Sequence, residues 1–115
     1  MKIKIISPLK DKLFVTLGSS GYLFFSTELV DELGIKEGRW IILGQGENGN
    51  LYIKPVDKDN ISAFKIYKRK NGKCSVFSIN VKNVLKQFNI EVNKTQRYEI
   101  EGMEDGFYKT DLILE

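Results

Sequence analysis

The chain has 115 residues, which is long enough for one domain with its own apolar core and short for two. Its net charge of +3, from 18 basic and 15 acidic side chains, is too small to require a polyanionic partner. Histidine is absent and cysteine occurs once, as Cys74, which excludes an internal disulfide, zinc sites of the Cys/His type and histidine acid–base catalysis. No segment fits a signal peptide or a membrane span, so we expect a cytoplasmic protein that does not contact a membrane.

The first half of the chain opens with a predicted β-hairpin. Apolar residues alternate with others over residues 13–17, which is the period of a strand. Residues 18–21 are small and flexible and predict a turn, and the aromatic run 22–25 predicts the returning strand.

A short helix is expected after this hairpin. Ser26 is suited to cap its first turn, and Gly34 is suited to end it in the left-handed conformation. Ile35 can then fold back on the last turn. The apolar face of the helix consists of Leu29, Val30 and Leu33.

Two more strands complete the first half. Residues 36–38 predict a turn and residues 39–43 a strand. The glycine- and asparagine-rich segment 45–50 predicts a second turn. Residues 51–53 are expected to return as a strand that Pro55 stops.

The second half repeats this order. Residues 64–67 and 74–77 predict strands, joined by a hairpin that the Asn71-Gly72 pair favours. Ser78 is a candidate helix cap. At the end of this second helix, Asn89 and Ile90 occupy the positions that correspond to Gly34 and Ile35 at the end of the first. The stripe that predicts this helix consists of Val81, Val84, Leu85 and Phe88. The last predicted strand is residues 98–101, followed by a turn at residues 104–106 and a closing apolar run at residues 112–114.

The two halves together predict a mainly β fold with short helices in one domain, residues 1–115. The first repeat spans residues 11–56, a polar linker residues 57–62, and the second repeat residues 63–115. One unit alone would expose much of its apolar sheet, whereas two interleaved strand–helix–strand units bury each other's apolar faces. We therefore expect the two units of this chain to pack into one β structure.

One segment resembles a known family. Leu33-Gly34-Ile35-Lys36-Glu37-Gly38, between a short helix and a strand, is similar to the signature of the AbrB/MazE swapped-hairpin (SpoVT-AbrB) family, and Leu51-Tyr52-Ile53-Lys54-Pro55 is similar to its closing strand. The resemblance covers residues 11–56 and implies a small interleaved β-barrel, of swapped-hairpin or related double-psi type. Here one chain would complete it as a pseudo-dimer, because the unit is duplicated in tandem. Many members of that family are transcription regulators or antitoxins that bind double-stranded DNA.

A basic cluster is the candidate nucleic-acid site. No acid interrupts the segment from residue 65 to residue 73. Its basic members are Lys65, Lys68, Arg69, Lys70 and Lys73. Such side chains could neutralise phosphates of DNA, and they are equally typical of a solvated hairpin tip. The first predicted hairpin, residues 18–22, has none of the arginines that the resemblance implies there, so the alternative is a non-enzymatic interaction module that binds a protein partner or a second copy of itself.

The aromatic residues allow two interpretations. Stacking of bases on an exposed sheet is one, and filling of a small barrel's core is the other. The residues concerned are Tyr22, Phe24, Phe25, Trp40 and Tyr52.

We expect no enzyme. The acidic side chains of the C-terminal region follow no metal-binding spacing, and they are more typical of a solvated face. The glycines of residues 18–21 and 44–46 precede no phosphate-binding motif. The sequence therefore predicts no catalytic residue, no metal site and no cofactor.

Overall fold

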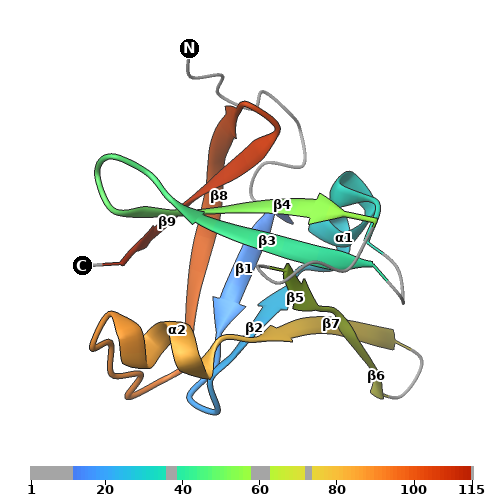
Figure 1. Cartoon of the computed structure of the whole chain (residues 1–115). Coiled ribbons are helices and arrows are strands. Elements are labelled where there is room, and N and C mark those ends of the chain that lie inside the picture. The colour runs from blue at the N-terminus through green and yellow to red at the C-terminus, as the bar shows by residue number, and fades with distance from the viewer. Residues whose placement is uncertain (1–11, 36–38, 58–62, 72–73, 115) are drawn as a thin grey trace.

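The computed structural model describes residues 12–35, 39–57, 63–71 and 74–114. Within these residues, nine strands form one sheet, and two short helices lie on opposite sides of it (Figure 1). The first half contains β1 (Phe14–Leu17), β2 (Tyr22–Phe25), α1 (Thr27–Leu33), β3 (Trp40–Gln45) and β4 (Asn50–Val56). The second half contains β5 (Ala63–Lys65), β6 (Tyr67–Asn71), β7 (Cys74–Asn80), α2 (Lys82–Gln87), β8 (Gln96–Glu104) and β9 (Phe107–Ile113).

The sheet is a nearly closed barrel, which confirms the predicted fold class. Its strand order is β5-β3-β4-β9-β8-β1-β2-β7-β6, and each described pair of neighbours is antiparallel. The hairpin β1–β2 from the first half lies between β8 and β7 from the second half. Strands β4 and β9 pair across the halves as well. Neither half therefore has a complete sheet of its own.

One apolar core fills the barrel. Both halves contribute to it: Val15, Leu23 and Ile53 come from the first half and Ile79 and Ile100 from the second, and each is at most 1% exposed. Along β1 and β2 every second side chain is buried, as expected for strands with one face on a core. The other face of these strands points outward.

The first helix ends as the sequence predicts. The backbone N–H of Leu29 donates to Ser26 Oγ over 3.2 Å, so Ser26 is the N-cap. Gly34 adopts the left-handed conformation at φ 64°, and Ile35 N–H donates to the Val30 carbonyl over 3.0 Å. This is a Schellman motif, and it buries Ile35 to 6% exposure.

Ser26 also ties the helix to the sheet. Its hydroxyl donates to the Lys12 carbonyl over 2.6 Å, and it accepts a hydrogen bond from Phe14 N–H over 3.2 Å. Both partners lie at the start of β1. The three hydrogen bonds of the Ser26 side chain thus join α1 to the barrel.

The predicted cap of the second helix is wrong. Ser78 lies inside β7, opposite Phe24 of β2, because β7 continues three residues beyond the expected end of the strand at residue 77. The N-cap residue is Val81, which has no capping side chain, and Asn80 supplies the acceptor instead: its Oδ1 accepts a hydrogen bond from Lys82 N–H over 3.0 Å. The helix ends as expected: Asn89 has φ 54°, and Ile90 N–H donates to the Leu85 carbonyl over 2.8 Å.

Pro55 does not stop its strand as predicted. It lies within β4, opposite Ile41 of β3. On the other side of β4, pairing with β9 is described only from Asn50 to Ile53. Beyond Ile53 one side of β4 is therefore unpaired, and a residue without an N–H is tolerated there.

The strand predicted over residues 64–67 is divided between two strands of the structure, β5 and β6. Ile66 interrupts it with a buried side chain, 2% exposed, and separates β5, which pairs with β3, from β6, which pairs with β7. Asn71 lies opposite Cys74, so the predicted hairpin is confirmed. The predicted turn at residues 36–38 and most of the predicted linker, residues 58–62, lie outside the described residues.

Ser26→Ala should lower the free energy of unfolding by about 2–3 kcal/mol, because it removes a helix cap and leaves a strand N–H without its partner. Asn80→Ala is the matched control: it removes only the exposed cap of α2 and should cost about 1 kcal/mol or less. Urea unfolding of both variants measures the difference. Equal losses would contradict the role of Ser26 as a link between helix and sheet.

Candidate nucleic-acid interface

The predicted basic cluster is divided between the two terminal strands of the described sheet, β5 and β6 (Figure 1). Lys65 ends β5, and Lys68, Arg69 and Lys70 lie in β6, whose only hydrogen-bonded neighbour in the described sheet is β7. All four side chains are exposed. Lys73 lies outside the described residues. The structure therefore places three of the five predicted residues together on β6, and Lys65 lies two residues before that strand.

Strand alternation divides these cations between two faces. Tyr67 pairs with Ser78 and Arg69 with Val76, whereas Lys68 pairs with Phe77. Successive side chains point to opposite faces, so Tyr67 and Arg69 share one face, while Lys68 and Lys70 share the other. The Lys68 ammonium accordingly lies 6.0 Å from the centroid of the Phe77 ring, which packs against the core.

The face of Tyr67 and Arg69 continues across four more strands. Tyr67 lies opposite Ser78, Ser78 opposite Phe24, Phe24 opposite Thr16, and Thr16 opposite Arg97. These residues form one row on the outer face, from β6 through β7, β2 and β1 to β8. Neighbouring strands lie about 4.8 Å apart, so the row is roughly 19 Å long.

Aromatic rings lie on both sides of this row, each next to a cation. The Arg97 guanidinium carbon lies 3.8 Å from the centroid of the Phe14 ring, and Lys82 Nζ lies 5.4 Å from that of Tyr22. Lys65 Nζ lies 5.7 Å from the Tyr67 ring. These separations fit cation–π interactions. We define the basic aromatic face as Phe14, Tyr22, Phe24 and Tyr67 with Lys65, Arg69, Lys82 and Arg97.

The aromatic residues are divided between the core and the surface. Phe25 is a core residue, 5% exposed. Tyr22 and Phe24 are half-buried on the outer face, with ring centroids 6.5 Å apart. Trp40 and Tyr52 are half-buried on β3 and β4, outside the basic aromatic face. Successive side chains of β2 alternate between the surface and the core, with Leu23 and Phe25 buried. This alternation was a signal in the sequence that could have separated Phe24 from Phe25.

Sequence analysis missed half of this face. Phe14, Tyr67, Lys82 and Arg97 were not predicted as site residues. Tyr67 adjoins the basic cluster, so its position was a usable signal. Lys82 and Arg97 lie far from the cluster in the sequence, and only the pairing of β1 with β8 and the start of α2 beside β2 bring them to it.

The positive character of this face ends at β8. Glu99 lies opposite Phe14, and Glu101 and Asp111 follow on β8 and β9. Burial raises the pKa of Asp111 above its ordinary value, and the negative charges of Glu101 and Glu99 raise it further. An acidic region thus borders the basic aromatic face.

Metal binding and membrane insertion can both be assessed for the described residues. No group of three or more His, Cys, Asp or Glu side chains there could hold a metal ion. No described helix has the length and apolar character needed to cross a bilayer.

Comparison of the chain with protein-family models, with curated proteins and with solved structures finds no match. The resemblance to the AbrB/MazE family accordingly stays a prediction, as does the choice between a swapped-hairpin and a double-psi topology.

Asp111→Asn should stabilise the protein near neutral pH. The raised pKa means that the folded state binds the Asp111 proton more tightly than the unfolded chain does. Asp111 therefore lowers stability as the pH rises from its ordinary pKa of 3.8 through its folded value, and the loss is complete above that. Unfolding curves at several pH values should show the variant more stable at pH 7 and equal to the parent well below pH 3.8. A stability difference that is the same at every pH would contradict this assignment.

Proposed function

We propose that the chain binds nucleic acid through the basic aromatic face, and that single strands fit this face better than duplexes. The observation that carries the proposal is the row from Tyr67 through Phe24 to Arg97, which crosses five strands of one sheet face. Three ring–cation pairs lie in or beside this row. Proteins that bind single strands combine a positive surface that follows the phosphates with aromatic side chains on which bases stack.

The geometry supports stacking at two places. Tyr67 is 48% exposed at the sheet edge, so a base can contact its ring without any change in the core. The second place is Arg97, whose guanidinium carbon lies 3.8 Å from the centroid of the Phe14 ring, because bases also stack on arginine guanidinium planes. Between these places lie Thr16, which is half-buried, and Ser78, which is buried at 8% exposure.

Double-stranded DNA is the second candidate, and the basic cluster of β6 favours it. A two-stranded β-ribbon such as β6–β7 can enter the major groove, and Lys68, Arg69 and Lys70 would lie along the phosphates. The roles of transcription regulator or antitoxin belong to this candidate and rest on the family resemblance.

A protein-interaction module is a third candidate because β6 is a free edge. An edge strand can pair with a strand of a partner or of a second copy. Three consecutive cations on that strand oppose such pairing, since charged edges are a common protection against it. Light scattering that shows a dimer which Arg69→Glu disperses would favour this candidate over nucleic acid.

Fluorescence anisotropy with a labelled oligothymidine and with a duplex of equal length tests the proposal. If three or four phosphates are contacted, the affinity for the single strand should fall roughly 20- to 50-fold between about 50 and 200 mM salt. The duplex should bind more weakly at each salt concentration. Absence of binding at low salt would refute nucleic-acid binding altogether, and tighter binding of the duplex would favour the ribbon.

Tyr67→Ala should weaken single-strand binding at least about 5-fold, since loss of one stacked base costs ~1 kcal/mol or more. Ile113→Ala is the matched control, because Ile113 is the other large apolar side chain that is strongly exposed among the described residues, at 45%, and it lies on β9. Its affinity should equal that of the parent. Equal effects of the two substitutions would contradict a specific role of Tyr67.

Arg69→Ala should make the plot of log affinity against log salt less steep by about 0.7, the value for one phosphate contact on a single strand. Lys54→Ala removes a cation from β4, outside the basic aromatic face, and should leave the slope unchanged. A slope that both substitutions alter equally would show that overall charge, and not this face, attracts the nucleic acid.

A further inference from the structure

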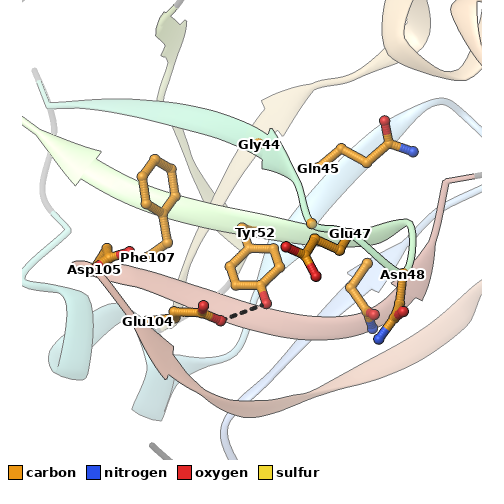
Figure 2. Close-up of a pocket in the computed structure, with 10 residues that line it drawn as sticks. Gly44, Gln45, Glu47, Asn48, Tyr52, Glu104, Asp105 and Phe107 are labelled. Carbon is orange, nitrogen blue, oxygen red and sulfur yellow. Dashed lines mark hydrogen bonds between the residues drawn. The ribbon is translucent and has the colours of Figure 1, made fainter. Parts of the chain in front are cut away.

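A cavity of about 420 Å³ lies on the other wall of the barrel. It is an open depression between the turn that joins β3 to β4 and the turn that joins β8 to β9 (Figure 2). Tyr52 and Phe107 provide its aromatic surface, and Glu47, Glu104 and Asp105 provide its carboxylates. None of these residues belongs to the basic aromatic face.

Glycines leave the room for this cavity. Gly44 lies opposite Tyr52, and a side chain there would meet Phe107 and Tyr52 only at ordinary contact distances of 3.6 and 3.9 Å. The absence of a side chain at Gly44 therefore leaves space beside the Phe107 ring and the Tyr52 Cβ. At Gly46 a Cβ would collide with the Tyr52 ring, so this ring lies directly on the backbone of the turn.

The rings and one carboxylate hold each other in place. Tyr52 and Phe107 meet edge to face, with centroids 6.5 Å apart and planes at 77°. The Tyr52 hydroxyl donates to Glu104 Oε2 over 3.1 Å (Figure 2). Burial raises the pKa of the Tyr52 hydroxyl, and the hydrogen bond and charge of Glu104 raise it further, so the hydroxyl stays a donor.

The charge of the cavity is negative. Its lining includes three carboxylates and no lysine or arginine. Two cations lie outside this lining: Lys109 Nζ lies 3.4 Å from Glu101 Oε2, and Lys54 Nζ lies 5.5 Å from the centroid of Phe107, a ring of the cavity wall. Lys54 demonstrates that an ammonium group is accommodated on this ring. An anion would be repelled here, and aromatic walls do not suit a hard metal ion, which takes oxygen ligands on several sides.

We propose that this cavity binds an organic cation, an alkylammonium or guanidinium group on a short apolar stem. The stem occupies the space beside Gly44 against Tyr52 and Phe107, and the charged head lies near Glu104 and Glu47. The cation comes either from a free amine or from a lysine or arginine side chain of a peptide. This site is independent of the proposed nucleic-acid interface.

The test titrates the isotope-labelled full chain with butylammonium, with agmatine, with a short arginine-containing peptide and with the neutral compound 1-pentanol. Amide NMR signals of Gly44, Gly46 and Gly106 report on the cavity. We expect saturable shifts of these signals with the cations and none with pentanol. If the peptide binds more tightly than agmatine, the source is a protein side chain, and if agmatine binds more tightly, it is a free amine.

Variants of the cavity complete the test. Glu104→Gln keeps the acceptor for Tyr52 but removes the charge, and it should weaken binding roughly 5-fold. Glu101→Gln, at the Lys109 pair outside the cavity, is the matched control and should not weaken it. Gly44→Leu fills the space and should abolish the shifts in a chain whose other signals show that it is folded. Equal shifts with pentanol, no saturable shift with any cation, or unchanged affinity in Glu104→Gln would overturn the proposal.

Discussion

Antiparallel pairing between the two halves is the constraint on which the rest of this structure depends. The hairpin β1–β2 has no sheet partner in its own half and is held by β8 on one side and β7 on the other. On the opposite wall, Asn50 of β4 donates to the Thr110 carbonyl of β9 over 2.9 Å, and Thr110 Oγ1 donates to the Leu51 carbonyl over 2.9 Å. Both side chains are buried, so loss of either contact would leave a polar group without a partner inside the barrel.

This pairing also determines which side chains are available for function. A strand in a small barrel commits one face to the core, and the outward face can carry other residues at little cost in stability. The outward residues differ between the two walls. The wall of β6, β7, β2 and β1 carries rings with cations, whereas the wall of β4, β9 and β8 carries rings with carboxylates. One fold thus supports two surfaces that suit ligands of opposite charge.

Local features of the fold could be predicted from the sequence, because short-range physics decides them. The Ser26 cap, the left-handed ends at Gly34 and Asn89 and the hairpin at residue 71 each follow from a few adjacent residues. Where a distant partner decides, the prediction was wrong: Ser78 pairs with β2 and does not cap a helix, and Pro55 continues β4 because one side of that strand is unpaired.

The same distinction applies to the candidate site. The basic residues are contiguous in the sequence, so they could be found, but their division between two faces depends on the register of β6 against β7. Arg97 and Lys82 join the face only through pairing across the halves, which no local pattern encodes. The cavity beside Tyr52 likewise depends on two turns that are far apart in the sequence.

The most direct measurement of the central claim is a map of the surface that a single-stranded oligonucleotide contacts. Amide NMR signals of the isotope-labelled chain, followed during addition of a short oligothymidine, provide this map. The account predicts that the shifts concentrate on β1, β2, β6 and β7 and at the start of β8, and that the residues of the β3–β4 turn do not respond. Shifts confined to the β3–β4 and β8–β9 turns, or no shifts at low salt, would contradict it.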